Sequence, residues 1–100
     1  MSETAPAHDR PELATDYTAP ENEVEEAIAE IWQGVFGIDR VGRDDDFFDL
    51  GGDSLMAIQV ASRMSQAFEV SVQVNDIFAM PTVAGLSDAT IERLVADAGL

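Results

Sequence analysis

The serine at position 54 is the residue of this chain that is best placed for chemistry. It follows Gly51-Gly52 and Asp53 within the stretch DDDFFDLGGDSL, residues 44–55. Glycines keep a turn open and allow positive φ angles, and aspartate or serine at the next position is typical of a helix N-cap. The stretch therefore predicts a hydroxyl group at the start of a helix, within reach of another protein. Three apolar side chains are expected to hold this loop by their burial: Phe47, Phe48 and Leu50.

Hydrolysis and calcium binding can both be tested against the same stretch. A hydrolase nucleophile elbow needs glycine two residues after the serine, but that residue is Met56, and the predicted folded region contains no histidine to act as a base. An EF-hand loop read from Asp44 needs a ligand at its fifth position and glycine at its sixth, and these are Phe48 and Asp49. We therefore predict neither a catalytic residue nor a metal site.

The charge balance limits the partners of the chain. Its 100 residues include 20 acidic residues against five arginines, which gives a formal net charge of −15. This charge opposes binding to nucleic acid or to an anionic membrane. There is no cysteine, so any sulfur chemistry must come from an added group. No apolar run could span a bilayer and no signal segment is recognisable, so we expect a cytoplasmic protein.

The first half of the chain predicts one helix between two irregular segments. Residues 1–20 are rich in Ala, Pro, Thr and acidic residues, without apolar periodicity, and are expected to be a disordered leader or linker. An amphipathic helix from about Glu23 to Phe36 follows, with Asn22 as N-cap, Glu25 as capping-box partner and Gly37 at its end. Residues 38–53 then form a loop that is too apolar to be disordered.

The second half predicts three further helices. One runs from about Ser54 to Ala67, and its exposed side is unusually neutral for so acidic a chain, which suits a contact surface. Residues 69–74 alternate like a strand but have no second strand to pair with, so a buried loop is expected. A short helix capped by Asn75 or Asp76 precedes a last helix capped by Thr82. The predicted fold class is all-α, a small four-helix bundle of three long helices and one short helix, with a long loop between the first two.

The stretch Asp-Asp-Phe-Phe-Asp-Leu-Gly-Gly-Asp-Ser-Leu resembles the attachment motif of phosphopantetheine-dependent carrier proteins, in the form found in peptidyl carrier (thiolation) domains of nonribosomal peptide synthetases. Ile77-Phe78, followed by Pro81-Thr82-Val83 and Leu86, also resembles the carrier pattern. The resemblance covers roughly Asn22 to Leu94. Carrier domains often have glycine where this chain has Glu69, so the end of the second helix is the feature that this departure puts in question.

The resemblance implies that Ser54 carries a 4′-phosphopantetheine arm, whose thiol holds an acyl group as a thioester. It implies a non-catalytic, monomeric carrier domain over residues 21–97, with a tail at 98–100. Its partners would be a phosphopantetheinyl transferase, which uses magnesium and coenzyme A, and adenylation, condensation, thioesterase or tailoring enzymes. Gly52, Asp53 and Leu55 would shape the attachment site, with Asp53 aiding docking or magnesium placement and Leu55 anchoring the helix. Four other side chains would contact partners: Met56, Gln59, Arg63 and Phe78.

Two alternatives to a peptidyl carrier remain open at this stage. One is an acyl carrier of the polyketide or fatty-acid type, which as a family has an acidic face on this helix, whereas here only Arg63 is charged after Asp53. The other is an acidic helical adaptor that is never modified, in which Ser54 serves only as a helix cap. The start at Met1 and the end soon after the last helix favour a free-standing protein, although an excised piece would look similar.

Overall fold

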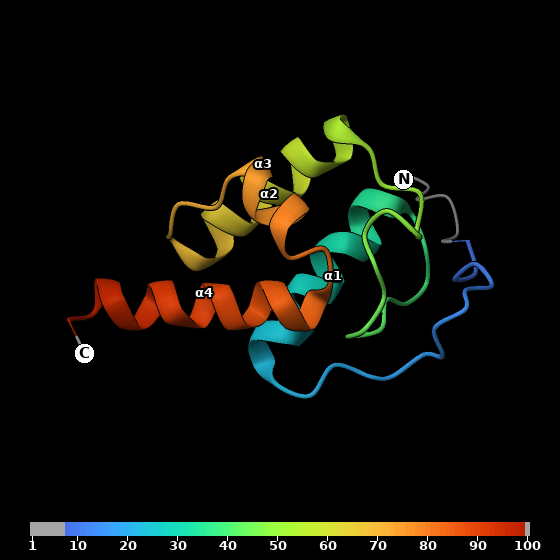
Figure 1. The fold of residues 1–100 in the computed structure, drawn as a ribbon, viewed down its shortest axis with the longest axis horizontal. Coiled ribbons are helices and arrows are strands. Elements are labelled where there is room, and N and C mark those ends of the chain that lie inside the picture. Colours follow the sequence, from blue (N-terminus) through green and yellow to red (C-terminus); the bar gives the residue numbers. More distant parts are fainter. Residues whose placement is uncertain (1–7, 100) are drawn as a thin grey trace, which may run out of the picture.

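The computed structural model describes residues 8–99, which form four α-helices and no strand. The helices are α1 (Glu23–Phe36), α2 (Ser54–Phe68), α3 (Val74–Ala79) and α4 (Val83–Asp97). The helix α1 lies against both α2 and α4, the short α3 lies beside α2, and the C-terminal end of α4 extends past the other helices (Figure 1). The predicted all-α bundle of three long helices and one short helix is thus confirmed.

The long helices begin at the predicted caps. The side chain of Asn22 accepts a hydrogen bond from Glu25 N at 2.8 Å, and Thr82 Oγ1 accepts one from Gly85 N at 3.1 Å. Gly37 ends α1 in the left-handed conformation, with φ at 71°. The carboxylate of Glu25 departs from the predicted capping box, because it accepts from Glu21 N and not from Asn22 N. Satisfied helix ends of this kind fix where each element starts and stops.

The region between α2 and α4 differs from the prediction in two details. The cap of α3 is Gln73, and Asp76 accepts the Gln73 N–H at 2.8 Å from inside the helix, so neither Asn75 nor Asp76 is the cap. The helix α2 ends one residue later than predicted, with Glu69 in the left-handed conformation at φ 54°. Residues 69–74 form no strand, as predicted, and Val74 is already the first residue of α3. The Ser65 hydroxyl bonds to both N and O of Val72 and holds this segment against α2.

The core lies where α1, α2 and α4 meet. Its largest fully buried side chains come from these three helices, from Ile77 of α3 and from the loop between α1 and α2. The loop contributes Phe47, which packs edge-on against Trp32 and Phe36 with ring centroids 5.4 and 5.3 Å apart. The α1–α2 loop, residues 38–53, therefore contributes side chains to the core. Burial of apolar side chains is the main stabilising term for such a small domain.

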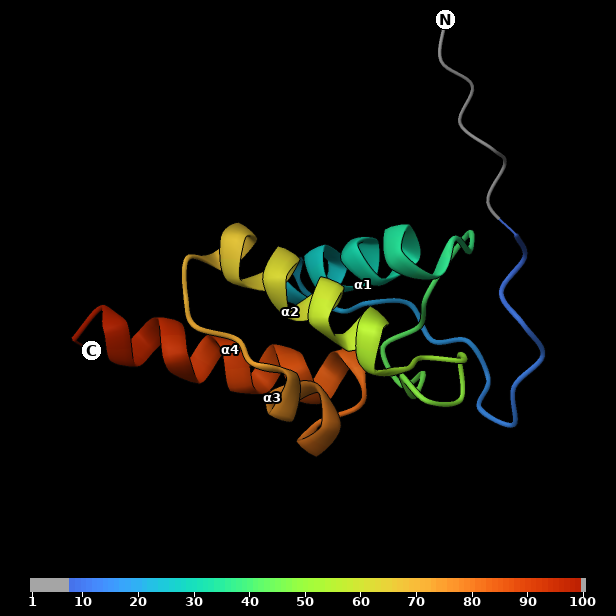
Figure 2. The same cartoon turned by 90° about the horizontal axis from the view of Figure 1, so that it is seen from above.

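The disorder predicted for residues 1–20 is wrong for residues 8–20, which run alongside the α1–α2 loop (Figure 2). His8 pairs with Ile38 through backbone hydrogen bonds to Gly37 and Asp39. Further along, Thr18 O accepts the Arg43 N–H at 2.8 Å. The composition of the segment misled the prediction because its order comes from contacts with a distant loop and not from its own periodicity. The part of the prediction that concerns residues 1–7 lies outside the described residues.

Candidate functional site

Ser54 is exposed at the first position of α2. Asp53 is the N-cap of this helix and accepts a hydrogen bond from Met56 N at 2.9 Å. Gly51 has a φ of 95°, and a Cβ built on it would meet no atom within 4 Å. The space before the serine is therefore open, and the hydroxyl can be reached from solvent. Of the two residues predicted as possible caps, Asp53 and Ser54, the structure has Asp53 as the cap, and Ser54 is exposed as predicted.

Gly52 is needed because the Phe47 ring lies directly beneath it. A Cβ at this position would lie 2.3 to 2.7 Å from three ring atoms of Phe47, well inside van der Waals contact. The Gly52 N–H also donates to Phe47 O at 2.9 Å, and Phe47 N donates to Pro81 O at 2.6 Å. The turn before Ser54 is thus anchored to the core through one buried phenylalanine. The carrier interpretation placed Gly52 in the attachment site, and the structure shows this contact as a reason for glycine there.

The three apolar side chains that were expected to anchor the loop do so unequally. Phe47 is fully buried, as predicted, and Leu50 is half-buried against the core. Phe48 is 47% exposed, so its predicted burial is wrong. Its ring stacks on Phe78 of α3 with centroids 5.6 Å apart, and Phe78 is itself 39% exposed. Successive side chains in this turn point in different directions, so one phenylalanine faces the core and the next faces α3.

The aspartates of the loop hold its shape. Asp46 Oδ1 accepts from Phe48 N at 2.8 Å and from Asp49 N at 3.1 Å, and its backbone O accepts from Leu50 N at 3.0 Å. Asp45 is fully buried and accepts hydrogen bonds from Gly42 N and from the guanidinium of Arg10. These contacts account for two of the acids that had been considered as calcium ligands. In residues 8–99 no group of three metal-ligating side chains is found.

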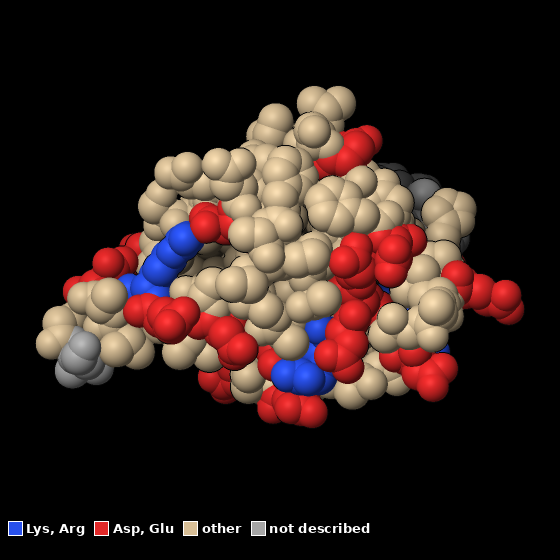
Figure 3. All heavy atoms as spheres, viewed as in Figure 1, with Lys and Arg blue, Asp and Glu red and all other residues tan. Residues whose placement is uncertain are grey.

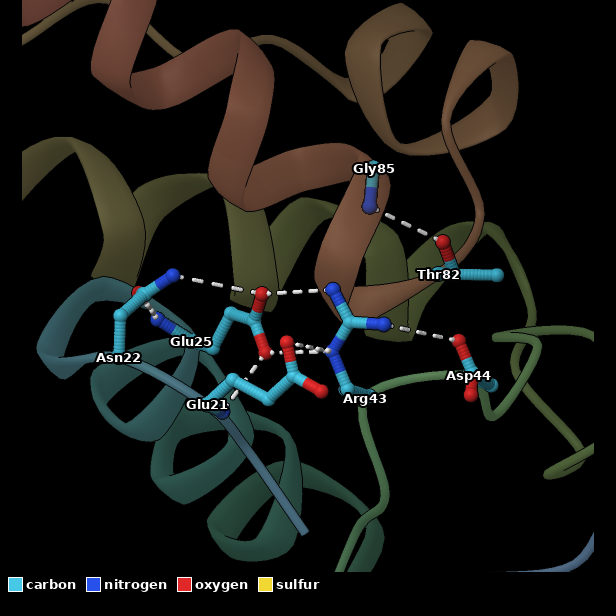
Figure 4. A network of polar contacts seen from close by, with 7 residues as sticks. All are labelled: Glu21, Asn22, Glu25, Arg43, Asp44, Thr82 and Gly85. Carbon is cyan, nitrogen blue, oxygen red and sulfur yellow. Dashed lines mark hydrogen bonds and ion pairs between the residues drawn. The ribbon is translucent and has the colours of Figure 1, made fainter. Parts of the chain in front are cut away.

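A second arginine joins the loop to the helices. Arg43 Nε and Nη2 bond to the Glu25 carboxylate at 2.9 and 3.0 Å, close to Glu21 and Asp44 (Figure 4). These hydrogen bonds lower the pKa of Glu25 despite its burial and raise that of Arg43. The Arg43 backbone O accepts from Ala84 N of α4 at 3.0 Å. One residue thus connects α1, α4 and the loop that leads to Ser54.

The sequence analysis missed both of these ion pairs. Each joins residues that are at least 18 positions apart, so local periodicity gives no sign of them. One signal was available. The chain has only five arginines against 20 acids, and two of the arginines, Arg40 and Arg43, lie in the apolar α1–α2 loop, which favours pairing with acids there. Acidic residues that are fully buried are almost always paired, and the loop acids were candidates for such pairing.

The exposed surface around Ser54 is apolar, and of the four predicted contact residues Phe78 alone belongs to it. Leu55 is 72% exposed and Ile58 53% exposed, so the prediction that Leu55 anchors α2 is wrong. Leu55 follows Ser54 directly in the chain, and the helical period places Ile58 on the same side of α2 as Ser54 and Ser65. Ser65 bonds to the segment before α3. This surface, called here the α2–α3 apolar surface, consists of Phe48, Leu55, Ile58, Phe78 and Met80.

The remaining predicted contact residues lie elsewhere on α2. Met56 is half-buried against the core. Arg63 extends over α1, where its Nη1 lies 3.1 Å from the position of a Cβ on Gly34. Gln59, like Arg63, is exposed. Figure 3 shows a largely uncharged area over α2 and α3, with acidic side chains gathered along α4 and near the loop.

A hollow of about 480 Å³ lies at the other end of the molecule. It is lined by the segment after α2 together with α3 and α4, and the ion pair between Arg93 and Asp76 forms part of its wall. The hydrogen bonds from Arg93 lower the pKa of Asp76. No residue of the loop before Ser54 lines this hollow, so it is separate from the serine site.

Fold and site together define a small helical domain that presents one exposed serine at a helix N-terminus, on a loop fixed to the core. A family described as "Phosphopantetheine attachment site" matches residues 26–90. Tyrocidine synthase 3 of Brevibacillus parabrevis is 55% identical over 73 residues, which are 73% of this chain and 1% of that synthase. The chain therefore spans a very small part of this relative.

Two solved structures have the same fold. The Pax NRPS docking domain complex, PaxA T1-CDD/PaxB NDD, matches with a TM-score of 0.78 and 38% identity, over 90% of this chain and 86% of that chain. The complex of the phosphopantetheine transferase Sfp with coenzyme A and a peptidyl carrier protein matches with a TM-score of 0.74 and 38% identity, over 77% of this chain and 100% of the matched chain.

The chain belongs to the phosphopantetheine attachment site family, because the match covers more than half of its residues. Its relatives and structural neighbours make it a peptidyl carrier domain of nonribosomal peptide synthesis, with 4′-phosphopantetheine as its cofactor. The residues present fit this cofactor, since an exposed hydroxyl stands beside an open glycine at a helix N-terminus. In residues 8–99 no helix is long and apolar enough to cross a membrane.

Proposed function

We propose that the 4′-phosphopantetheine arm is attached to Ser54. The observation that carries this proposal is the position of the serine, exposed at the start of α2 directly after the anchored Gly52 turn. A phosphopantetheinyl transferase would join the Ser54 Oγ to the phosphorus of the arm, with release of the adenosine bisphosphate part of coenzyme A and loss of the hydroxyl proton. When bound, the arm supplies a thiol that can hold an acyl group as a thioester.

The surroundings of Ser54 favour a phosphate at this position. The first amides of a helix lack partners within the helix, and the helix dipole favours negative charge at its N-terminus. Asp53 uses its carboxylate to accept the Met56 N–H, so its first role is to begin α2 and orient the serine. A part for Asp53 in docking or in magnesium placement stays a prediction. The domain itself performs no catalytic step in this proposal, and it gains effective concentration for its cargo by tethering.

The α2–α3 apolar surface is the proposed contact site for the transferase. Its side chains border Ser54 and are exposed, and such side chains form the energetic centre of many interfaces. A carrier protein of the same fold is bound to the transferase Sfp in the matched complex, which supports a partner of this kind. Of the predicted contact residues, Phe78 belongs to this surface and Gln59 adjoins it. Contacts through Met56 and Arg63 would need a partner that reaches the α1 side of α2.

Adenylation, condensation, thioesterase or tailoring enzymes are proposed as the later partners of the loaded arm. A structure of McyG A-PCP matches 75% of this chain, which supports an adenylation partner. We expect the domain to act as a monomer in the cytoplasm, and both expectations rest on the sequence and the family resemblance.

The test is the intact mass of the chain after incubation with a promiscuous phosphopantetheinyl transferase, magnesium and coenzyme A. We expect one added phosphopantetheine in the wild type and none in Ser54→Ala, whose helical circular dichroism should be unchanged. The matched control is Ser62→Ala, because Ser62 is an exposed serine within the same helix. No gain in folded wild type, with a control carrier modified in parallel, would contradict the proposal and leave the unmodified adaptor as the better account.

A further inference from the structure

Arg10 links the N-terminal segment to the inside of the α1–α2 loop. Its Nε donates to Asp45 Oδ2 at 2.7 Å and its Nη2 donates to Thr15 O at 2.9 Å, while its backbone N donates to Asp39 Oδ1 at 2.9 Å. The Asp45 side chain is fully buried, and the Arg10 side chain is only 11% exposed. Arg10 Nη2 also donates to Asp45 Oδ1, so the pair is a buried, two-point contact between residues 35 positions apart. Contacts of this geometry are among the stronger ones available to arginine.

The same segment closes over the loop at a second point. A Cβ on the buried Gly42 would lie 3.0 Å from Thr18 O and 3.2 Å from a ring carbon of Tyr17. Arg40 lies over the Tyr17 ring at 4.1 Å from its centroid. Residues 10–18 therefore contact the part of the loop from Asp39 to Asp45. We name the Arg10–Asp45 ion pair together with the Gly42 contact the N-terminal clasp.

The clasp is connected to the serine by a short series of contacts. Asp45 is two residues before Phe47, whose backbone bonds to Pro81 and whose ring supports Gly52. Gly52 in turn is two residues before Ser54. A loop that shifts at Asp45 moves the residue on which the turn before the serine rests. Because cores are close-packed, such a shift is not absorbed by free space around Phe47.

We propose that Arg10 is a positioning residue for the modification of Ser54, an inference that rests on the proposed attachment at that serine. Without the guanidinium, the Gly42 N–H is the one hydrogen-bond donor that the described residues still offer to the buried Asp45 carboxylate. A buried charge without its partner is strongly unfavourable, so the loop opens around Asp45 in much of the population. A smaller fraction of the molecules then presents Ser54 to the transferase in its native position.

The experiment measures steady-state kinetics of phosphopantetheine transfer to the full chain, with the carrier as the varied substrate. If the loop stays in place in one molecule in ten of Arg10→Ala, the KM for the carrier rises roughly tenfold while kcat stays the same. Arg10→Lys keeps the charge without the two-point geometry, so its KM should lie between those of the wild type and Arg10→Ala. Gly42→Ala perturbs the clasp from the other side without changing charge and should raise KM as well.

The control is Arg93→Ala, which removes a contact of the same two-point geometry at a more exposed place in the molecule. Arg93 also binds one aspartate, Asp76, at two points and one backbone carbonyl, that of Ser71. Amide hydrogen exchange at Phe47 and Gly52 should accelerate in Arg10→Ala and stay at the wild-type rate in Arg93→Ala. Circular dichroism and urea titration establish that every variant is folded under the conditions of the assay.

The outcomes separate the inference from the proposed function. An unchanged KM in folded Arg10→Ala and Gly42→Ala would overturn the positioning role and leave the clasp as a contribution to stability alone. A wild type that gains no arm, or a Ser54→Ala variant that gains one, would instead refute the attachment at Ser54. A KM that rises equally in Arg10→Ala and Arg93→Ala would also overturn the inference, because the effect would then follow general destabilisation.

Discussion

Replacement of Gly52 by alanine is the sharpest test of how the turn before the serine is held. The new methyl group would lie 2.3 to 2.7 Å from three ring atoms of Phe47, where ordinary contacts are 3.4 to 4 Å. The ring has little room to retreat, because Trp32 and Phe36 pack against it with centroids within 5.4 Å. Overpacking of a core costs about 1–3 kcal/mol, and a clash of this depth on a fully buried ring belongs at the upper end, near 3 kcal/mol.

The assay is urea unfolding followed by circular dichroism. With a slope of about 1 kcal/mol per molar for a small domain, a loss of about 3 kcal/mol lowers the midpoint by roughly 3 M. Gly34→Ala is the matched control, since the same methyl group in the interior of α1 meets only the flexible end of Arg63. It should stabilise the domain by about 0.5–1 kcal/mol. The same substitution at two glycines thus has opposite predicted signs.

A second variant identifies Phe47 as the cause. Leucine at position 47 lacks the Cε2 and Cζ atoms that the new methyl group would meet, so Gly52→Ala should cost less than half as much in a Phe47→Leu background. The reasoning is refuted if Gly52→Ala lies within about 0.5 kcal/mol of wild type, which is the usual range for an uncoupled surface change. It is refuted equally if the cost is the same in both backgrounds, because the clash would then not involve the ring.

Two further predictions concern the end of α2 and the loss of stability at acidic pH. Glu69→Gly should stabilise the domain by about 1 kcal/mol, because Glu69 has a φ of 54° that glycine adopts without strain. The melting temperature should then rise by roughly 4–8 °C, and an unchanged melting temperature would contradict this prediction. The native pKa values of Glu25 and Asp76 are lowered by their arginines, so their stabilisation is present above the ordinary carboxyl pKa and is lost as the pH falls through the native values. Urea midpoints measured from pH 7 downwards should fall less steeply for Glu25→Gln than for the wild type, and equal slopes would show that Glu25 does not contribute.

The helices could be predicted from the sequence because their determinants are local. The apolar stripe of α1, its cap at Asn22 and the glycine after it all lie within about 16 residues, so α1 was placed at its observed bounds. Thr82 before α4 was predicted for the same reason, and the cap of α2 was narrowed to Asp53 or Ser54, of which Asp53 is the cap. The cap of α3 was missed, because Gln73 is a weaker cap than the Asn75 and Asp76 that follow it, and the helix begins earlier than its polar residues indicate.

The site was predictable in part. The position of Ser54 depends on its neighbours in the chain, and the motif around it is long, so the sequence sufficed. Which side of α2 faces outward beside α3 depends on the packing of two other elements, and for this reason Leu55 was expected to anchor the helix and Met56 to face the partner. Phe47 and Phe48 are chemically identical neighbours, and only the turn made by Asp46 decides which of them enters the core.

The distribution of the five arginines connects the charge of the chain to its site. Arg10 and Arg93 each pair with one carboxylate, and Arg43 pairs with Glu25 and lies close to two more. The carboxylates of Asp45 and Glu25 are buried, so these positive charges join segments of the chain to one another. They leave the exposed acids of α1 and α4 largely unneutralised, which keeps a chain of net charge −15 soluble but repels like-charged partners. The apolar surface beside Ser54 lacks such acids on its own side chains, so it is the face on which a partner meets the least repulsion. Arg10 and Arg43 therefore fix the loop that carries the serine, and docking is left to contacts that depend on shape.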